Sequence, residues 1–231
     1  MSATTTKTMI RAERLTKRIG DSTLFSNIDL RVDSGECLGI VAANGADRSV
    51  LLRILATLVP PSSGSIDIDG IDAVRRVFAV RSRLMYFGEP SPADGGIRVR
   101  EHLDLVTAVR QPDRQCARAA IEDALRRTAL PGDALVDELP PRLGHRLTLA
   151  SSLAAGPAVL VLDDPFGPIE PETRRVFVEC LREISQRGTT VVLGGREHDI
   201  DSVCHRIVRL ESGRLAPYFH SDLVLSSAAG M

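Results

Sequence analysis

The stretch CLGIVAANGADRSVLL at residues 37–52 decides how this chain folds. Residues 37–42 form an apolar run whose length suits a buried strand. Small and polar residues follow over 43–49, where a loop is expected. Apolar residues then recur at helical spacing over 49–59, until Pro60 ends the pattern. The sequence therefore predicts a strand, a loop and a helix in immediate succession.

This order is the layout of a phosphate-binding loop, whose pattern is G-x-x-x-x-G-K-S/T. Three of the four fixed positions differ here, because Ala42 and Asp47 replace the glycines and Arg48 replaces the lysine. Ser49 keeps its residue type, and no lysine occurs after Lys17, so no shift of the alignment restores the motif. The layout predicts the architecture more firmly than it predicts ATPase chemistry.

Composition suits an ordinary soluble globular protein. The chain has 231 residues, a hydrophobic share of 43% and a charged share of 26%, which fits one domain with an inserted subdomain. A net charge of −1 gives no reason to expect a nucleic acid or an anionic membrane as partner. The most apolar run, 51–59, is too short to span a bilayer and contains Arg53, so we expect any membrane role to come through a partner.

The cysteines are far apart in the sequence and form no C-x-x-C pair. This spacing argues against a zinc site or a disulfide framework and suits a reducing cytoplasm. They are Cys37, Cys116, Cys180 and Cys204.

Strand-like and helix-like segments alternate along the chain. The expected strands are 9–19, 24–32, 37–42, 66–68, 84–87, 159–162, 189–193, 207–210 and 214–215. The expected helices are 49–59, 71–82, 98–110, 115–129, 142–155 and 171–187. This alternation predicts an α/β fold with a parallel sheet covered by helices on both faces. We expect one domain over 1–231, with a core lobe at 9–97 and 157–216, an inserted helical subdomain at 98–156, and a tail at 217–231.

The order and spacing of several short motifs over residues 9–216 resemble the ATP-binding subunit of an ABC transporter, of the bacterial drug-export type. The motifs are NGA at 44–46, PSSG at 61–64, VREHL at 99–103, RLTLA at 146–150, VLVLDDP at 159–165 and SGRL at 212–215. The resemblance implies a P-loop NTPase-type mixed sheet flanked by helices, and ATP and Mg²⁺ as cofactors. It implies a transmembrane permease as partner, together with a second copy of itself or another ATP-binding subunit, at the cytoplasmic face of the plasma membrane.

The resemblance assigns nucleotide contacts to a set of residues around the altered loop. They are Asn44, Gly45, Ala46, Arg48, Ser49 and Val50. The Asp47 carboxylate would face the phosphates, and two like charges at about 4 Å cost about 1 to 4 kcal/mol. Arg48 keeps a positive charge and is able to grip phosphate, although its shape differs from that of lysine. The interpretation that we favour is that Asp47 and Arg48 pair with each other and fill an empty pocket.

The metal ligands that the resemblance implies are Ser49, Asp163 and Glu89. Glu89 stands where the family has a glutamine, and a solvated loop residue is an equally good interpretation of it. Asp164 stands where the family has the glutamate that orients or deprotonates the attacking water. Because Asp164 is one methylene shorter, we expect hydrolysis to be severely slowed.

Three further positions depart from the family pattern. Ile19 replaces the aromatic residue that stacks on adenine, and LPPRL at 139–143 replaces the signature LSGGQ. Prolines have no N–H to offer a phosphate, and we interpret Arg142 as solvated or ion-paired. Arg196 occupies the switch-histidine position, and His198 is interpreted as a surface residue.

The altered positions are nucleotide contacts, whereas the core strands and helices are intact. We therefore expect a folded, nonhydrolysing subunit that docks on a permease through the loop at 88–97 and the helical subdomain. A slow but genuine ATPase subunit is one alternative, and a soluble interaction module derived from the family is another.

Overall fold

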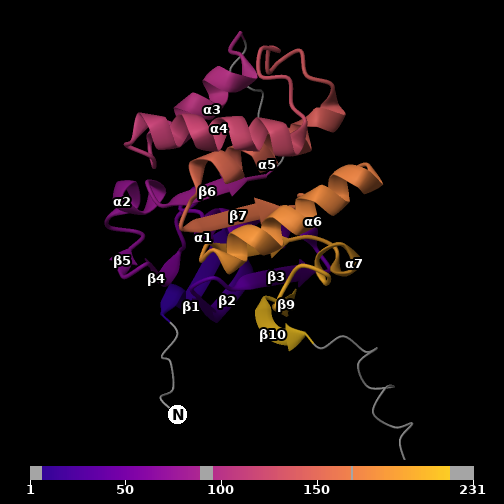
Figure 1. Cartoon of the computed structure of the whole chain (residues 1–231). Coiled ribbons are helices and arrows are strands. Elements are labelled where there is room, and N and C mark those ends of the chain that lie inside the picture. The colour runs from indigo at the N-terminus through magenta and orange to yellow at the C-terminus, as the bar shows by residue number, and fades with distance from the viewer. Residues whose placement is uncertain (1–6, 89–95, 168, 219–231) are drawn as a thin grey trace, which may run out of the picture.

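The computed structural model describes residues 7–88, 96–167 and 169–218, and the chain forms two sheets with helices around them (Figure 1). The larger sheet has six strands in the order β10-β9-β3-β8-β7-β6. Its strands are β3 (Cys37–Ala42), β6 (Leu84–Phe87), β7 (Val159–Asp163), β8 (Thr190–Gly194), β9 (Arg206–Glu211) and β10 (Arg214–Tyr218). All neighbours pair in parallel except β10, which is antiparallel to β9. The predicted parallel sheet is therefore confirmed.

The smaller sheet is antiparallel and has four strands in the order β2-β1-β4-β5. They are β1 (Thr8–Ile19), β2 (Ser22–Asp33), β4 (Ser63–Ile68) and β5 (Ile71–Asp72). Ile28, Leu30 and Val32 of β2 are buried and alternate with exposed residues, so one face of this sheet packs against the core. The sequence predicted the long strands, but not that they form a second sheet.

Helices cover both faces of the larger sheet, as predicted. Helix α1 (Gly45–Leu55) contributes Leu51, Leu52, Ile54 and Leu55 to a core shared with residues of both sheets. Helix α6 (Pro171–Gln186) packs Phe177 and Leu181 against the other face. The short helices α2 (Val77–Arg81) and α7 (Glu197–Ile200) complete this lobe.

Helices α3 (Val99–Ala108), α4 (Arg114–Thr128) and α5 (Pro141–Ala155) form the helical subdomain, which lies above the sheets in Figure 1. These helices have a hydrophobic cluster of their own, which includes Leu103, Ile121 and Ala150. Arg110 connects them to the core lobe by donating to the carbonyl oxygens of Arg81 and Leu84 at 3.0 and 2.6 Å. The limits of 98 and 156 given to the subdomain remain a prediction.

Two helix predictions were wrong in their bounds. Helix α1 begins at Gly45 rather than 49, and it ends at Leu55, before Thr57 takes a φ of 61°. The segment 71–82, expected as one helix, contains the short strand β5 followed by α2. Within the described ranges, no helix has both the length and the apolar composition required to cross a bilayer.

Candidate functional site

The loop expected between β3 and α1 is largely absorbed into the helix. Asn44 is the N-cap of α1, and its Oδ1 accepts a hydrogen bond from the Ala46 N–H at 3.0 Å. Asp47 lies in the first turn, where a carboxylate interacts favourably with the positive end of the helix dipole. A glycine at 47 would lack this effect and favour a loop. The backbone at 45–48 is therefore a helical turn rather than the open phosphate cradle that the motif layout predicted.

Arg48 pairs with Asp163 and not with Asp47, so the expected pairing within the loop was wrong. Its Nη2 lies 3.4 Å from Asp163 Oδ1, and the two side chains are only 9% and 7% exposed. Asp47 is partly exposed and forms no ion pair with any residue of the described ranges. The contact joins the start of α1 to the carboxyl end of β7.

Gly194, the last residue of β8, makes room for the Arg48 side chain. A Cβ at this position would lie 3.0 Å from Arg48 Nε, 3.1 Å from Arg48 Cδ and 2.3 Å from Leu52 Cδ1. Arg48 Nε is buried and has no hydrogen-bond partner among the described residues. Within the described part of the chain, the guanidinium is thus held by packing and by one long contact rather than by a full set of hydrogen bonds.

Tyr86, near the end of β6, lies at the second oxygen of the same carboxylate. Its Oη is 3.5 Å from Asp163 Oδ2, and burial raises the pKa of Tyr86, with the Asp163 charge adding to the effect. The phenol stays neutral and is able to donate a proton to the carboxylate. Sequence reasoning missed Tyr86, although β6 and β7 are adjacent parallel strands whose carboxyl ends meet at one edge.

The metal set implied by the sequence does not fit Mg²⁺ as it is arranged. Mg²⁺ requires a near-octahedral shell of oxygen ligands. Asp163 instead faces a guanidinium and a phenol, and Arg48 brings a positive charge to the place beside the carboxylate. Ser49 follows Arg48 on α1 and is partly buried, and Glu89 lies outside the described residues.

Asp164, the expected water-orienting residue, has a left-handed backbone with a φ of 53°. Its N–H donates to the carbonyl oxygen of Gly194 at 2.8 Å, which fixes this conformation, and aspartate tolerates it better than most residues do. Burial lowers the pKa of His145 on α5, and the negative charge of Asp164 opposes that shift. Asp164 is exposed and acts electrostatically on α5 of the same chain.

The signature segment and the switch position both lie at the N-terminus of a helix. Pro140 is the N-cap of α5, and the side chain of Arg142 lies outside the described residues. Arg196 caps α7 and donates from Nε to Asp199 Oδ2 at 3.0 Å. Asp199 is buried and also accepts from Arg174 at 2.6 Å. His198 has a side chain that is 71% exposed.

Ile19, at the end of β1, is 57% exposed. This exposure leaves its apolar side chain available for contact.

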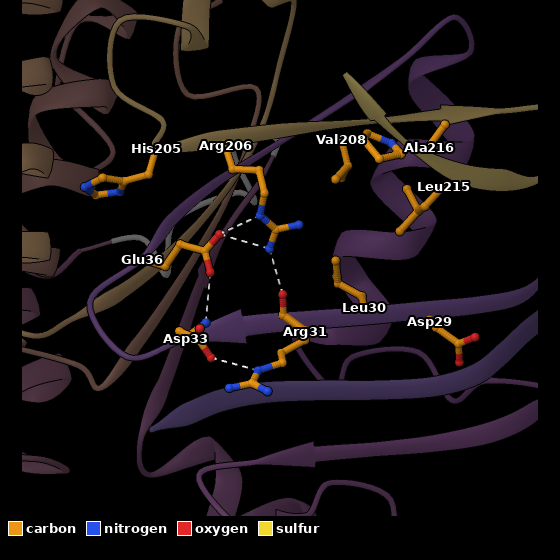
Figure 2. A pocket seen from close by; sticks show the side chains of 11 residues that line it. Asp29, Leu30, Arg31, Asp33, Glu36, His205, Arg206, Val208, Leu215 and Ala216 are labelled. Atoms are coloured by element: carbon orange, nitrogen blue, oxygen red, sulfur yellow. Dashed lines mark hydrogen bonds and ion pairs between the residues drawn. The ribbon is translucent and has the colours of Figure 1, made fainter. Parts of the chain in front are cut away.

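A separate groove of about 640 Å³ lies between β2 and the β9–β10 hairpin (Figure 2). Both arginines of its lining are paired, because Arg206 contacts Glu36 at 2.9 Å and Arg31 contacts Asp33 at 3.0 Å, and Asp29 leaves the lining with an excess of negative charge. Arg206 also donates to the carbonyl oxygen of Arg31 at 2.7 Å. The groove therefore does not suit an anionic ligand, and the candidate site stays at the carboxyl edge of the larger sheet.

Comparisons with known proteins agree on one family. A family model described as ABC transporter matches residues 25–167. The daunorubicin resistance ATP-binding protein DrrA3 of Streptomyces coeruleorubidus is 31% identical over 226 residues, which cover 96% of this chain and 72% of the relative. The Nod factor export ATP-binding protein I of Paraburkholderia xenovorans is 30% identical over 208 residues, covering 89% of this chain and 68% of the relative.

Solved structures show the same fold. The structure of an ATP-binding subunit of an ABC transporter superposes with a TM-score of 0.86 at 19% identity, covering 93% of this chain and 91% of that one. A dimeric ATP-binding cassette in a post-hydrolysis state, bound to ADP and Pi, superposes with a TM-score of 0.76 at 21% identity, covering 90% and 96%. The mixed α/β fold with a helical subdomain is therefore confirmed.

Proposed function

Because the chain belongs to the ABC transporter family, we propose that it is an ATP-binding-type subunit of a membrane export complex and that it does not hydrolyse ATP. Two relatives carry names that refer to daunorubicin resistance and to Nod factor export, which supports an export role. The subunit docks on a transmembrane permease and is held through it at the inner face of the plasma membrane. Its role there is structural or regulatory.

The buried contact between Arg48 and Asp163 carries this proposal. The guanidinium places a fixed positive charge where Asp163 would otherwise meet a divalent cation. Freeing the carboxylate requires breaking a buried ion pair, which costs about 3 to 5 kcal/mol when one partner is left alone. That penalty weakens metal-dependent nucleotide binding by about 10²- to 4 × 10³-fold.

Asp47 adds a second obstacle at the N-terminus of α1. The positive end of a helix normally attracts a phosphate, and here a side-chain carboxylate in the first turn already supplies the negative charge. An incoming triphosphate meets like charge at this point. Asp164, one methylene shorter than the glutamate of the family, weakens any remaining catalysis of water attack.

Pairing with a second subunit follows from the family. A related cassette is dimeric with ADP and Pi bound, which supports a dimer here with a second copy or with a different ATP-binding subunit. Helix α5, which begins at Pro141, is the segment that we expect to face the nucleotide of the partner. Prolines at the start of that helix offer fewer N–H donors to such a nucleotide.

A slow ATPase is the second candidate function. Ser49 and Asp163 are both present, and α1 starts at the carboxyl edge of the parallel sheet, where open α/β sheets bind ligands. A soluble interaction module is a third, and copurification with a permease separates it from the first two.

Calorimetric titration with ATP, with and without Mg²⁺, tests the proposal, together with an assay of phosphate release. We expect weak binding that Mg²⁺ does not strengthen, and no turnover. The double variant Asp47→Gly/Arg48→Lys should bind Mg-ATP more tightly. Arg75→Lys, at a side chain that is 87% exposed, is the matched control and should change nothing. Tight Mg-ATP binding with turnover by the unaltered chain would establish the second candidate instead.

A further inference from the structure

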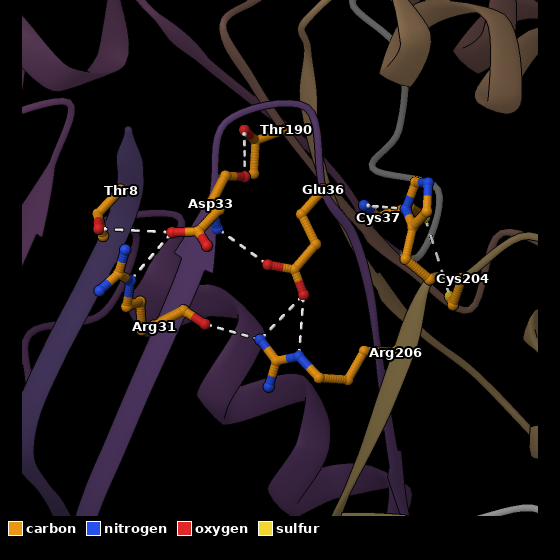
Figure 3. Close-up of polar contacts among 9 residues, drawn as sticks. Thr8, Arg31, Asp33, Glu36, Cys37, Thr190, Cys204 and Arg206 are labelled. Carbon is orange, nitrogen blue, oxygen red and sulfur yellow. Dashed lines mark hydrogen bonds and ion pairs between the residues drawn. The ribbon is translucent and has the colours of Figure 1, made fainter. Parts of the chain in front are cut away.

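Cys37 and Cys204 form a thiol pair that their separation in the sequence does not predict. They are 167 residues apart, yet their Sγ atoms lie 3.9 Å from each other, and both are free thiols (Figure 3). Cys37 is the first residue of β3, and Cys204 lies two residues before β9 begins. The pair thus joins two neighbouring strands of the larger sheet.

Backbone contacts hold the two sulfur atoms in this position. The Cys37 N–H donates to Nδ1 of His205 at 2.9 Å, and the His205 N–H donates to the Cys37 carbonyl oxygen at 2.8 Å. Gly39 leaves space for the second thiol, since a Cβ there would lie 3.0 Å from Cys204 Sγ. Strands β3 and β9 pair with Leu38 opposite Arg206, so Cys204 lies one position from the residue opposite Cys37. Paired strands lie about 4.8 Å apart, and this offset is compatible with the Cα separation of about 4.4 to 6.8 Å in disulfides.

The two thiols differ in access. Cys37 is 1% exposed, whereas Cys204 is partly exposed. The hydrogen bond to Cys37 and burial together raise the pKa of Cys204, so this group is a thiol at neutral pH and reacts slowly. An external reagent reaches Cys204 first, and Cys37 is the sulfur next to it.

We propose that Cys37 and Cys204 are a modification site that a small-molecule disulfide, such as oxidised glutathione, converts into an intramolecular disulfide. The Cys204 thiolate attacks one sulfur of the oxidant and releases one thiolate, which leaves a mixed disulfide on Cys204. The Cys37 thiolate then attacks the Cys204 sulfur and releases the second thiolate. The two protein thiols are oxidised, the oxidant is reduced to two thiols, and the two protons pass to those products.

The cross-link closes a loop of 167 residues and ties the start of β3 to the segment that returns from α7. A disulfide across so long a loop restricts the unfolded chain strongly. The oxidised protein should therefore unfold at a higher temperature, by at least about 5 °C.

The test exposes the full chain to oxidised glutathione at pH 8, then denatures it in N-ethylmaleimide and maps the peptides by mass spectrometry. We expect a linked pair of peptides containing Cys37 and Cys204, together with the rise in melting temperature. Cys116 is exposed and should acquire only a mixed disulfide.

Two variants sharpen the result. Cys116→Ser should form the same cross-link, and Cys204→Ser should leave Cys37 available to N-ethylmaleimide after denaturation. The proposal is overturned if Cys37 and Cys204 are both still alkylated once Cys116 is fully modified, or if Cys204 stops at the mixed disulfide. Both observations are made on the unaltered chain, so they do not depend on whether a variant folds.

Discussion

Replacement of Arg48 by methionine tests the contact on which the proposed function depends. Methionine keeps most of the aliphatic stem that packs against Gly194, and it removes the guanidinium. Among the described residues, Asp163, 7% exposed, is then left without its cation and keeps the Tyr86 hydroxyl at 3.5 Å. Loss of stability after this change reports mainly on the ion pair.

The magnitude follows from the geometry. Two unit charges separated by 3.4 Å attract by about 5 kcal/mol at an effective dielectric constant of about 20. Desolvation of both groups offsets much of this, and removal of one member of a buried pair costs about 3 to 5 kcal/mol. The contact is long and Arg48 Nε has no partner among the described residues, so we expect about 3 kcal/mol, or about 6 to 12 °C in melting temperature.

A double-mutant cycle separates the pair from its surroundings. Asp163→Asn should also destabilise the chain, and Arg48→Met/Asp163→Asn should cost less than the sum of the two, by at least about 1.5 kcal/mol. Urea unfolding followed by far-ultraviolet circular dichroism gives the change in the free energy of unfolding for each of the three variants relative to the unaltered chain. The control Arg75→Met removes a guanidinium that is 87% exposed, and the unfolding midpoint should not move.

Divalent cations provide a second measurement on the same variants. Mg²⁺ at 10 mM should not raise the melting temperature of the unaltered chain, because Arg48 holds Asp163. Mg²⁺ should raise the melting temperature of Arg48→Met, because the Asp163 carboxylate is free in this variant and a ligand that binds only the folded state stabilises it. An additive cycle, or equal stabilisation of both proteins by Mg²⁺, would refute the reasoning.

Three further predictions concern the surroundings of the site. Gly194→Ala should cost about 1 to 3 kcal/mol in urea unfolding, because its Cβ would lie 2.3 Å from Leu52 Cδ1; an unchanged midpoint would mean that the space is larger than described. Arg174→Ala should lower the free energy of unfolding by about 2 to 3 kcal/mol in the same assay. This is less than the usual cost of breaking a buried ion pair, about 3 to 5 kcal/mol, because Arg196 still contacts buried Asp199. Burial lowers the pKa of His145 below its ordinary value of about 6.5, so the unfolded chain binds more protons and stability should fall as the pH drops below about 6.5. His145→Gln should make melting temperatures less dependent on pH in that range, and an identical profile would contradict the assignment.

Periodicity was enough to predict the architecture of the core. The apolar runs of β3, β7 and β8 are strands that are buried almost throughout, and α6, between β7 and β8, lies where the spacing of apolar residues predicts. The existence of a second sheet depends on which strands pair, and an alternating pattern along one strand does not specify its partner.

The start of α1 was predictable from a local rule that the motif layout obscured. An asparagine followed three residues later by an acid, as Asn44 and Asp47 are, is typical of a helix N-terminus. The loop pattern favoured a later start. The partners of Arg48, Tyr86 and Cys37 could not be predicted, because these contacts join residues 115, 77 and 167 positions apart.

The two charged replacements in the loop act on opposite charges of a Mg-nucleotide. Asp47 places a negative charge at the positive end of α1, where phosphate would bind, and Arg48 places a positive charge beside Asp163, where the metal would bind. In Asp47→Gly alone, the Asp163 carboxylate is still paired with Arg48. In Arg48→Lys alone, the Asp47 carboxylate still places a negative charge at the N-terminus of α1. Each single reversal therefore removes one obstacle while the other still opposes the same ligand. Measurable recovery of nucleotide binding should therefore require both changes, and this makes the joint variant Asp47→Gly/Arg48→Lys more informative than either single change.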